Sequence, residues 1–252
     1  MFTTSTPELE ILGAAITTQE IKQQPKLWED TYAIYTNNRD KIDTFISSAR
    51  ELGGKRRTRV VFTGAGTSQY VGDTITPYLR RFGETNTFEF ASVATTDIVS
   101  DPLGSLDADD PTVLISFARS GNSPESMAAV QVARSLVKDL LLVNITCAPE
   151  GRLAVESQGK TDTLTLLIPG ANDQGFAMTG SFSCMALLAT LVFDTSSHEQ
   201  KAAWVMDAAT LGREVISREH EIAAWLEADF ERITYLGSGP FSGLAREAQL
   251  KV

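Results

Sequence analysis

Short apolar runs alternate with longer stretches of helical periodicity through the middle of the chain. The runs lie at 59–63, 88–91 with Val93, 112–117, 140–146 and 163–168, and the main helical stretches lie at about 67–82, 124–137, 181–193 and 198–218. Strands that are apolar almost throughout and separated by helices indicate a parallel sheet covered on both faces. We therefore predict an α/β fold: a doubly wound, flavodoxin-like domain with five parallel strands and right-handed crossovers.

The N-terminal part has a different pattern, since residues 8–52 show helical periodicity without a strand signal. Pro25 is expected to divide them into two helices, the second opening at Lys26 and ending at the Gly53-Gly54 pair. Residues 1–52 are thus expected to form an N-terminal helical segment and 53–195 the α/β domain.

An internal repeat appears near the end of the chain. VVFTGAG at 60–66 aligns with ITYLGSG at 233–239, an offset of 237 − 64 = 173 residues. Each copy is an apolar run, a G-x-G turn and a helix start, as in a duplicated domain. A single strand and helix lack pairing partners. We therefore expect residues 196–230 to be connecting helices and 231–252 to be the first strand and helix of a truncated second domain.

Composition and charge exclude some classes of function. The net charge of −10 argues against a nucleic-acid surface, so an anion site would have to be local. Cys147 and Cys184 are expected to be buried free thiols, and His198 and His220 to lie on the surface without binding metal. The beginning of the chain lacks a signal-peptide pattern and its most apolar stretch, 184–193, is too short to span a bilayer, so we expect a cytoplasmic protein without membrane contact.

Hydroxyl-rich sequence follows the run at 112–117, where residues 116–126 read SFARSGNSPES. Ser123 is a candidate N-cap, and Pro124 suits the first turn of a helix. Ser120 and Asn122 remain, at a helix start that could bind phosphate. Because caps and Asx-turns use the same residue types, a purely structural role stays open for this loop alone.

A second loop of this kind, GAGTSQ, follows the run at 59–63. Gly66 permits close backbone approach, while Thr67 and Ser68 place hydroxyls at a helix start. Gln69 stands where a dinucleotide fingerprint requires a third glycine, and the Gly-Lys-Ser/Thr of a P-loop is missing. Two such helix starts on one sheet edge favour a single phosphomonoester.

Together these motifs resemble those of a known family. G-x-G-T-S, followed about fifty residues later by S-G-x-S/T-P-E, resembles the sugar isomerase (SIS) domain, which binds phosphosugars, and the likeness covers roughly residues 60–252. SFARSGNSPES and the duplicated layout are similar to the AgaS subgroup of tagatose-6-phosphate ketose/aldose isomerases and galactosamine-6-phosphate deaminase-isomerases. The resemblance implies two SIS domains, no metal, no nucleotide or other cofactor, and a homodimer or higher homo-oligomer.

The same resemblance implies site residues. It places Thr67 and Ser68 in a first phosphate loop and Ser120 and Ser123 in a second. Further substrate contacts are expected from Gly66, Arg119, Asn122 and Thr179. Arg119 could instead point to solvent. The chain departs from the family pattern at three positions, where Ala118, Met178 and Gly180 replace two serines and a lysine.

Isomerising an aldose to a ketose moves a proton between adjacent carbons, which a nearby carboxylate can do. In LAREAQLKV, Glu247 matches the glutamate of the family's A-L-E-G-A-L-K pattern, so the resemblance implies that it is the proton shuttle. The alternative is an exposed glutamate paired with Lys251 at i,i+4. Neither His198 nor His220 matches the family's ring-opening histidine, so this chain alone could bind without catalysing.

We therefore expect an enzyme that converts galactosamine 6-phosphate, or a related aldose phosphate, to tagatose 6-phosphate. With the amino sugar, water takes part in the release of ammonia, so we also class the reaction with the hydrolases. The alternative is a non-catalytic phosphosugar sensor. Regulators of that kind usually carry a basic DNA-binding head, but in residues 1–52 acidic residues outnumber basic ones.

Overall fold

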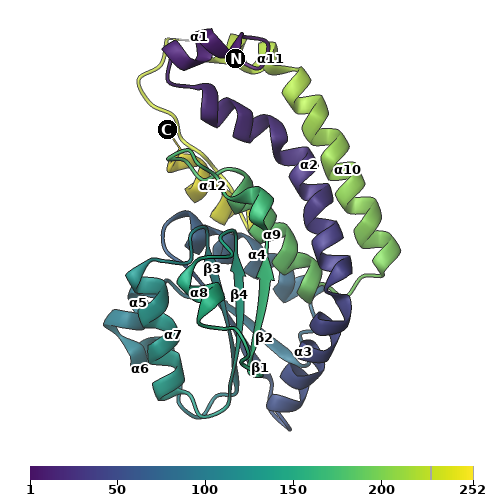
Figure 1. The fold of residues 1–252 in the computed structure, drawn as a ribbon, viewed down its shortest axis with the longest axis vertical. Coiled ribbons are helices and arrows are strands. Elements are labelled where there is room, and N and C mark those ends of the chain that lie inside the picture. Colours follow the sequence, from purple (N-terminus) through teal and green to yellow (C-terminus); the bar gives the residue numbers. More distant parts are fainter. Residues whose placement is uncertain (228, 252) are drawn as a thin grey trace.

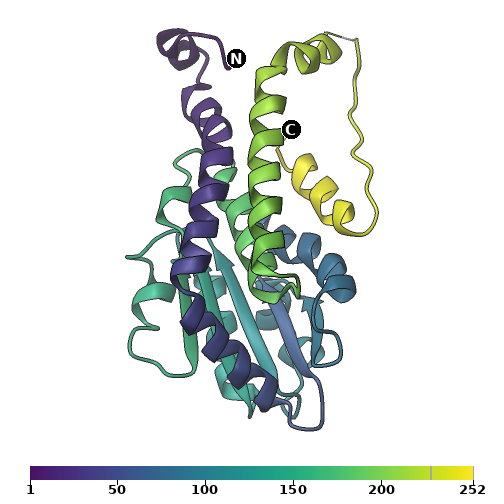
Figure 2. The same cartoon turned by 90° about the vertical axis from the view of Figure 1, so that its right-hand side faces the viewer.

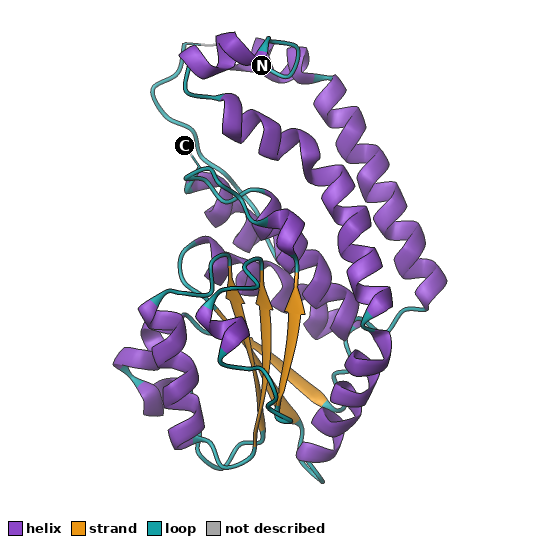
Figure 3. Ribbon diagram, viewed as in Figure 1, coloured by secondary structure: helices purple, strands orange, loops and turns teal. Residues whose placement is uncertain are grey.

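The computed structural model describes residues 1–227 and 229–251 and contains one five-stranded sheet, all of whose strands are parallel (Figure 3). The strands are β1 (Thr58–Thr63), β2 (Phe88–Ser92), β3 (Thr112–Ala118), β4 (Leu140–Thr146) and β5 (Thr163–Leu167). Each predicted run forms a strand, and the doubly wound α/β prediction is confirmed. The spatial order is β2-β1-β3-β4-β5.

This strand order places a topological switch point between β1 and β3. From β1 the chain crosses to β2 on one side, and then returns past β1 to add β3, β4 and β5 on the other side. The two strands at the switch pair in parallel register, with Thr63 opposite Ser116. Ligands of open parallel sheets bind beyond the carboxyl ends of the strands at such a point.

Helices cover both faces because side chains alternate along each strand. Val61, Leu114 and Leu142 face α5 (Thr95–Ser100), α6 (Pro102–Ser105) and α7 (Pro124–Leu136). Their neighbours Val60 and Phe62 face the opposite layer. That layer contains α3 (Arg39–Leu52), α4 (Thr67–Phe82) and α9 (Gly180–Phe193), and the short α8 (Arg152–Val155) follows β4.

Outside the sheet layers, α2 (Ala15–Asn37) and α10 (His198–Ser217) run side by side and project past the carboxyl edge of the sheet (Figures 1 and 2). Their close packing requires Gly212, where a Cβ atom would lie 2.7 Å from the Trp28 ring. The short helices α1 (Thr6–Ile11) and α11 (Glu219–Leu226) lie near their far ends.

The predicted helix break at Pro25 is wrong. Pro25 lies inside α2, and the chain turns instead at Asn38, whose side chain donates to Ile34 O. Proline removes one backbone donor from a helix. The buried Leu27 and Tyr35 further along α2 pack into the main core, and this tertiary packing maintains the helix.

The strand predicted for the second repeat is not formed in this structure, although its helix is present. Residues 233–239 are extended without strand pairing, and α12 (Pro240–Gln249) follows. A strand requires a hydrogen-bonded neighbour, and no strand of the described residues lies beside this segment. Leu236 is accordingly 89% exposed.

The cysteine prediction is confirmed, whereas that for the histidines holds in part. Cys147 and Cys184 are free and buried, and burial raises the pKa of Cys184 to about 12. His220 is exposed, but His198 is half-buried, with its Nδ1 atom 3.5 Å from the Tyr35 hydroxyl. In the part of the chain that the structure describes, no helix has the length and apolar character needed to cross a membrane, and no His, Cys, Asp or Glu cluster suits a metal.

Phe62 offers a test of the core. It is fully buried, stacks on Phe90 and Phe117 and meets the edge of Phe193. Phe62→Ala should lower the free energy of unfolding by about 3–5 kcal/mol in urea denaturation, since it removes buried area and leaves a cavity. The control Phe176→Ala, at a fully exposed position, should change it by less than about 0.5 kcal/mol. Equal effects would contradict this packing.

Candidate functional site

Two hydroxyl-rich loops flank the switch point. The first loop, residues 64–67, leaves β1 and enters α4, and the second loop, residues 119–123, leaves β3 and enters α7. The first loop is anchored to the start of α5. Its Gly64 carbonyl oxygen accepts hydrogen bonds from the Thr95 amide at 2.9 Å and from the Thr95 hydroxyl at 3.1 Å. Both loops therefore occupy the edge of the sheet where a ligand is expected.

The first loop depends on the glycines of its motif. A Cβ atom on Gly64 would lie 2.5 Å from the backbone carbon of Ser68, so the turn closes directly onto the helix. Gly66 has φ 56° and ψ −126°, a conformation open essentially to glycine alone. Thr67 and Ser68 follow it as buried residues of the first helical turn. The sequence thus places two hydroxyls at a helix N-terminus, where anions are favoured.

The second loop contains two residues whose side chains bind the protein itself and one whose hydroxyl is accessible to a ligand. The Ser123 hydroxyl accepts from the Ser126 amide at 3.2 Å and so caps α7 as predicted. Asn122 Oδ1 accepts from the Arg152 amide at 2.9 Å and ties the loop to the start of α8. Ser120 is exposed and its hydroxyl accepts one long hydrogen bond, 3.3 Å, from the Asn122 amide. Among these hydroxyls, Ser120 is the one most available to a ligand.

The helix of the second repeat copies the first. Gly239 has φ 57° and ψ −130°, almost the values of Gly66. The packing of α12 against α4 is close enough that a Cβ on Gly243 would lie 2.5 Å from the Thr74 amide nitrogen. Arg246 pairs with Asp73 at 3.0 Å, and 246 − 73 = 173 equals the repeat offset. This ion pair therefore joins corresponding positions of the two copies.

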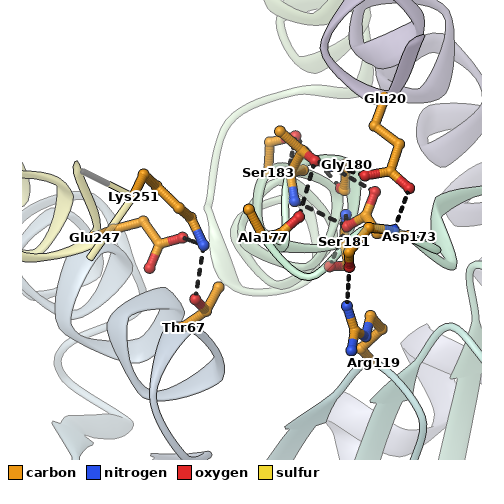
Figure 4. Close-up of polar contacts among 12 residues, drawn as sticks. Glu20, Thr67, Arg119, Asp173, Ala177, Gly180, Ser181, Ser183, Glu247 and Lys251 are labelled. Atoms are coloured by element: carbon orange, nitrogen blue, oxygen red, sulfur yellow. Dashed lines mark hydrogen bonds and ion pairs between the residues drawn. The ribbon is translucent and has the colours of Figure 1, made fainter. Parts of the chain in front are cut away.

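This packing decides the environment of Glu247. The residue is 4% exposed, so the alternative of a surface glutamate is wrong, although its predicted ion pair with Lys251 forms at 2.8 Å. Lys251 Nζ also donates to the Thr67 hydroxyl at 3.0 Å (Figure 4). The ion pair is a charge contact without hydrogen-bond geometry, and neither Glu247 carboxylate oxygen accepts a hydrogen bond from the described residues.

Lys251 is a residue that sequence reasoning treated only as a partner of Glu247. The structure shows that its ammonium group connects the carboxylate of α12 to the first loop of the other repeat. A signal was available, since an i,i+4 lysine lies on the same helix face as the glutamate. The contact with Thr67 spans 184 residues and has no local sequence signal.

A third loop, residues 172–179, lies between β5 and α9, after the single turn of 3₁₀ helix η1 (Pro169–Ala171). Asp173 accepts hydrogen bonds from the amides of Thr179, Gly180 and Ser181 at 2.8–3.1 Å and stabilises the start of α9. Thr179, a predicted substrate contact, donates its hydroxyl to Glu20 of α2 at 3.3 Å.

Arg119 does not point to solvent, and its predicted substrate contact stays a prediction. Its guanidinium donates to the Gly175 carbonyl at 2.9 Å and so joins the second loop to the third. Glu20 and Asp173 were missed by the sequence analysis. Their roles depend on contacts between segments far apart in the chain, for which no motif was visible.

The family follows from comparison with known proteins. The SIS domain model matches residues 55–193. This chain belongs to the SIS domain family. The match lies within the predicted first domain and includes all three loops and the helices α4 and α9.

Three relatives add detail. D-galactosamine-6-phosphate deaminase AgaS of Shewanella sp. (strain ANA-3) is 36% identical over 249 residues, or 98% of this chain and 62% of the relative. The crystal structure of tagatose-6-phosphate ketose/aldose isomerase from Escherichia coli is 31% identical, has a TM-score of 0.86, and is matched over 98% of this chain and 65% of its own. A Clostridium novyi NT crystal structure is 39% identical with a TM-score of 0.91 and is matched over 100% of this chain and 63% of its own.

The chain thus spans about three-fifths of the length of these relatives. The names of the Shewanella and Escherichia proteins describe a deaminase and an isomerase. Our placing of the reaction among the hydrolases is therefore wrong.

The close approach at Gly243 can be tested. Gly243→Ala should displace α12 from α4, because the new methyl group meets backbone atoms of Asp73 and Thr74 that cannot move aside. Overpacking of this kind costs about 1–3 kcal/mol, so hydrogen exchange of the α12 amides should become about tenfold faster or more. Ser242→Ala, at an exposed position of the same helix, is the control. Unchanged exchange in Gly243→Ala would contradict the packing.

Proposed function

We propose that the protein containing this chain is a phosphosugar isomerase and deaminase that converts galactosamine 6-phosphate to tagatose 6-phosphate and ammonia. The observation that carries the proposal is the buried carboxylate of Glu247, whose ion-pair partner Lys251 also donates to the Thr67 hydroxyl. The family match and the names of the relatives support the substrate class.

Glu247 has the role of proton carrier in this proposal. It takes the C2 proton of the open-chain amino aldose and returns it to C1 through an enol-type intermediate. C1 becomes the alcohol and C2 an imine, which water converts to the ketone and ammonia. Burying a carboxylate is costly unless it is paired, and the Lys251 ammonium offsets part of this cost. Neither carboxylate oxygen accepts a well-directed hydrogen bond from the described residues. A substrate hydroxyl would supply the missing donor.

The phosphate is proposed to bind between the first and second loops, through Thr67, Ser68, Ser120 and Ser123 at the N-termini of α4 and α7. The convergence of both loops at the switch point supports this location. Further contacts are proposed from Gly66, Arg119, Asn122 and Thr179. Lys251 adds a positive charge beside Thr67.

The arrangement of the whole protein is part of the proposal. Its division is 1–52 helical segment, 53–195 first SIS domain, 196–230 connecting helices and 231–252 the start of a second SIS domain. The matching loop geometry of Gly66 and Gly239 supports the duplication. We propose a cytoplasmic homodimer or higher homo-oligomer that uses no cofactor and binds no nucleic acid.

Glu247→Gln tests the carboxylate directly. It keeps the shape of the side chain but removes the base, so turnover of galactosamine 6-phosphate by the full-length protein should fall about 10²–10⁴-fold, while substrate affinity stays similar. Ammonia release and ketose formation are the measurements. The matched control is Glu214→Gln on α10, an exposed carboxylate. Full turnover by Glu247→Gln would refute the assignment, and wild-type binding without any turnover would favour the phosphosugar sensor.

The two serines of the second loop should behave differently on substitution. Ser120→Ala removes an exposed hydroxyl with one weak contact, so stability should be unchanged while phosphosugar affinity drops about tenfold, as for a hydrogen bond to a charged group. Ser123→Ala removes the cap of α7 and should lower the free energy of unfolding by about 1 kcal/mol. Calorimetric titration and urea denaturation measure the two effects. Unchanged affinity in Ser120→Ala would contradict the phosphate site.

A further inference from the structure

Glu20 is a buried acid on a helix that lies outside the matched SIS domain. It belongs to α2 and is 5% exposed. Its Oε1 atom accepts hydrogen bonds from the amides of Gln174 at 2.6 Å and Gly175 at 2.9 Å, and its Oε2 atom accepts from the Thr179 hydroxyl at 3.3 Å. The carboxylate thus binds the third loop at two places.

Several features show that this contact fixes the loop closely. A Cβ on Gly175 would lie 2.8 Å from Glu20 Oε2, so the loop can approach the carboxylate only because this residue has no side chain. At the other end of the loop, Asp173 holds the amides of Thr179 and Gly180. Figure 4 shows Glu20 and Asp173 close to Gly180 and Ser181 at the start of α9. Charged acceptors make the stronger class of hydrogen bond.

Gly175 also connects the loop to the predicted phosphate site. Its amide donates to Glu20, and its carbonyl accepts from Arg119 at 2.9 Å. The peptide groups of this residue therefore lie between a negative and a positive side chain, which orient them from both directions. The Arg119 side chain reaches from the second loop to this carbonyl, so the contact fixes the third loop relative to the second.

We propose, on the basis of the function proposed above, that Glu20 is a positioning residue for the sugar part of the substrate. It does not touch the substrate; it sets the place of the third loop, and with it the Thr179 hydroxyl, relative to the second loop. The first loop has a separate support in the contact of Gly64 with Thr95. Loss of Glu20 should therefore affect binding of the sugar and leave binding of phosphate nearly intact.

The test uses Glu20→Gln in the full-length protein. Glutamine removes the negative charge and keeps only one acceptor oxygen. If that oxygen stays with the Gln174 and Gly175 amides, the NH2 group of glutamine replaces the acceptor of the Thr179 hydroxyl. The control is Asp30→Asn, a matched change at a half-exposed acid of α2 whose ion pair among the described residues is with Lys26. The measurements are kcat and KM for galactosamine 6-phosphate and the inhibition constant of inorganic phosphate.

For Glu20→Gln we expect KM to rise about tenfold or more, whereas the inhibition constant of inorganic phosphate stays within about twofold of wild type. Asp30→Asn should match wild type in both. An unchanged KM would overturn the proposal. An equal rise of KM and of the inhibition constant of phosphate would also overturn it. A fall in kcat alone, in proportion to the folded fraction, would overturn it too, because a merely structural role predicts these results.

Gly175→Ala provides a second route if Glu20→Gln does not fold. The added methyl group would push the loop from Glu20 while leaving the carboxylate in place, and it should give the same rise in KM without a change in phosphate inhibition. An unchanged KM in Gly175→Ala would overturn the proposal. A wild-type protein that neither binds nor converts galactosamine 6-phosphate would instead overturn the proposed function itself, and this inference with it.

Discussion

The parallel direction of all five strands is the constraint on which the candidate site depends. Because parallel strands end at the same edge, the loops after β1, β3 and β5 leave the sheet together. The strand order then places the first two loops on either side of the switch point. Every polar group of the site enters from this edge, either on one of these loops or on a helix that packs over them.

Buried carboxylates distinguish two kinds of position at this edge. Asp173 accepts hydrogen bonds from the amides that open α9, and Glu20 accepts them from the third loop. Both charges are stabilised in the structure as it stands. Glu247 is equally buried but has only the charge of Lys251 beside it. Asp173 and Glu20 hold backbone amides in place, whereas Glu247 holds no backbone group among the described residues and is paired with a single side chain. This contrast separates positioning residues from the proposed base.

Local physics explains why much of the fold could be predicted from sequence. Apolar runs become strands, Ser123 caps a helix, and Gly66 adopts a combination of φ and ψ that is open essentially to glycine. Each of these depends on neighbouring residues. The misses depend on distant ones. Pro25 lies within a helix because Leu27 and Tyr35 pack into the core. Residues 233–239 do not form a strand because no strand of the described residues lies beside them.

The same limit applies to the candidate site. The hydroxyls of the first two loops were visible as motifs, and the resemblance to a family supplied Glu247. The contacts of Lys251 with Thr67 and of Arg119 with Gly175 join segments 184 and 56 residues apart. No pattern within one segment encodes such a distance, so these contacts required the structure.

The two copies of the internal repeat have the same backbone conformation at the start of the helix, but they contribute different functional groups. Subtracting the offset of 173 places Thr74 in the first copy at the position of Glu247, and Tyr78 at that of Lys251. In the first copy these positions serve the fold, since Thr74 bonds to the carbonyl of Tyr70 and Tyr78 to the carboxylate of Asp194. The first copy instead contributes its helix-start hydroxyls. A carboxylate, an ammonium group and hydroxyls therefore meet only because α12 packs on α4, and Gly243 permits that contact.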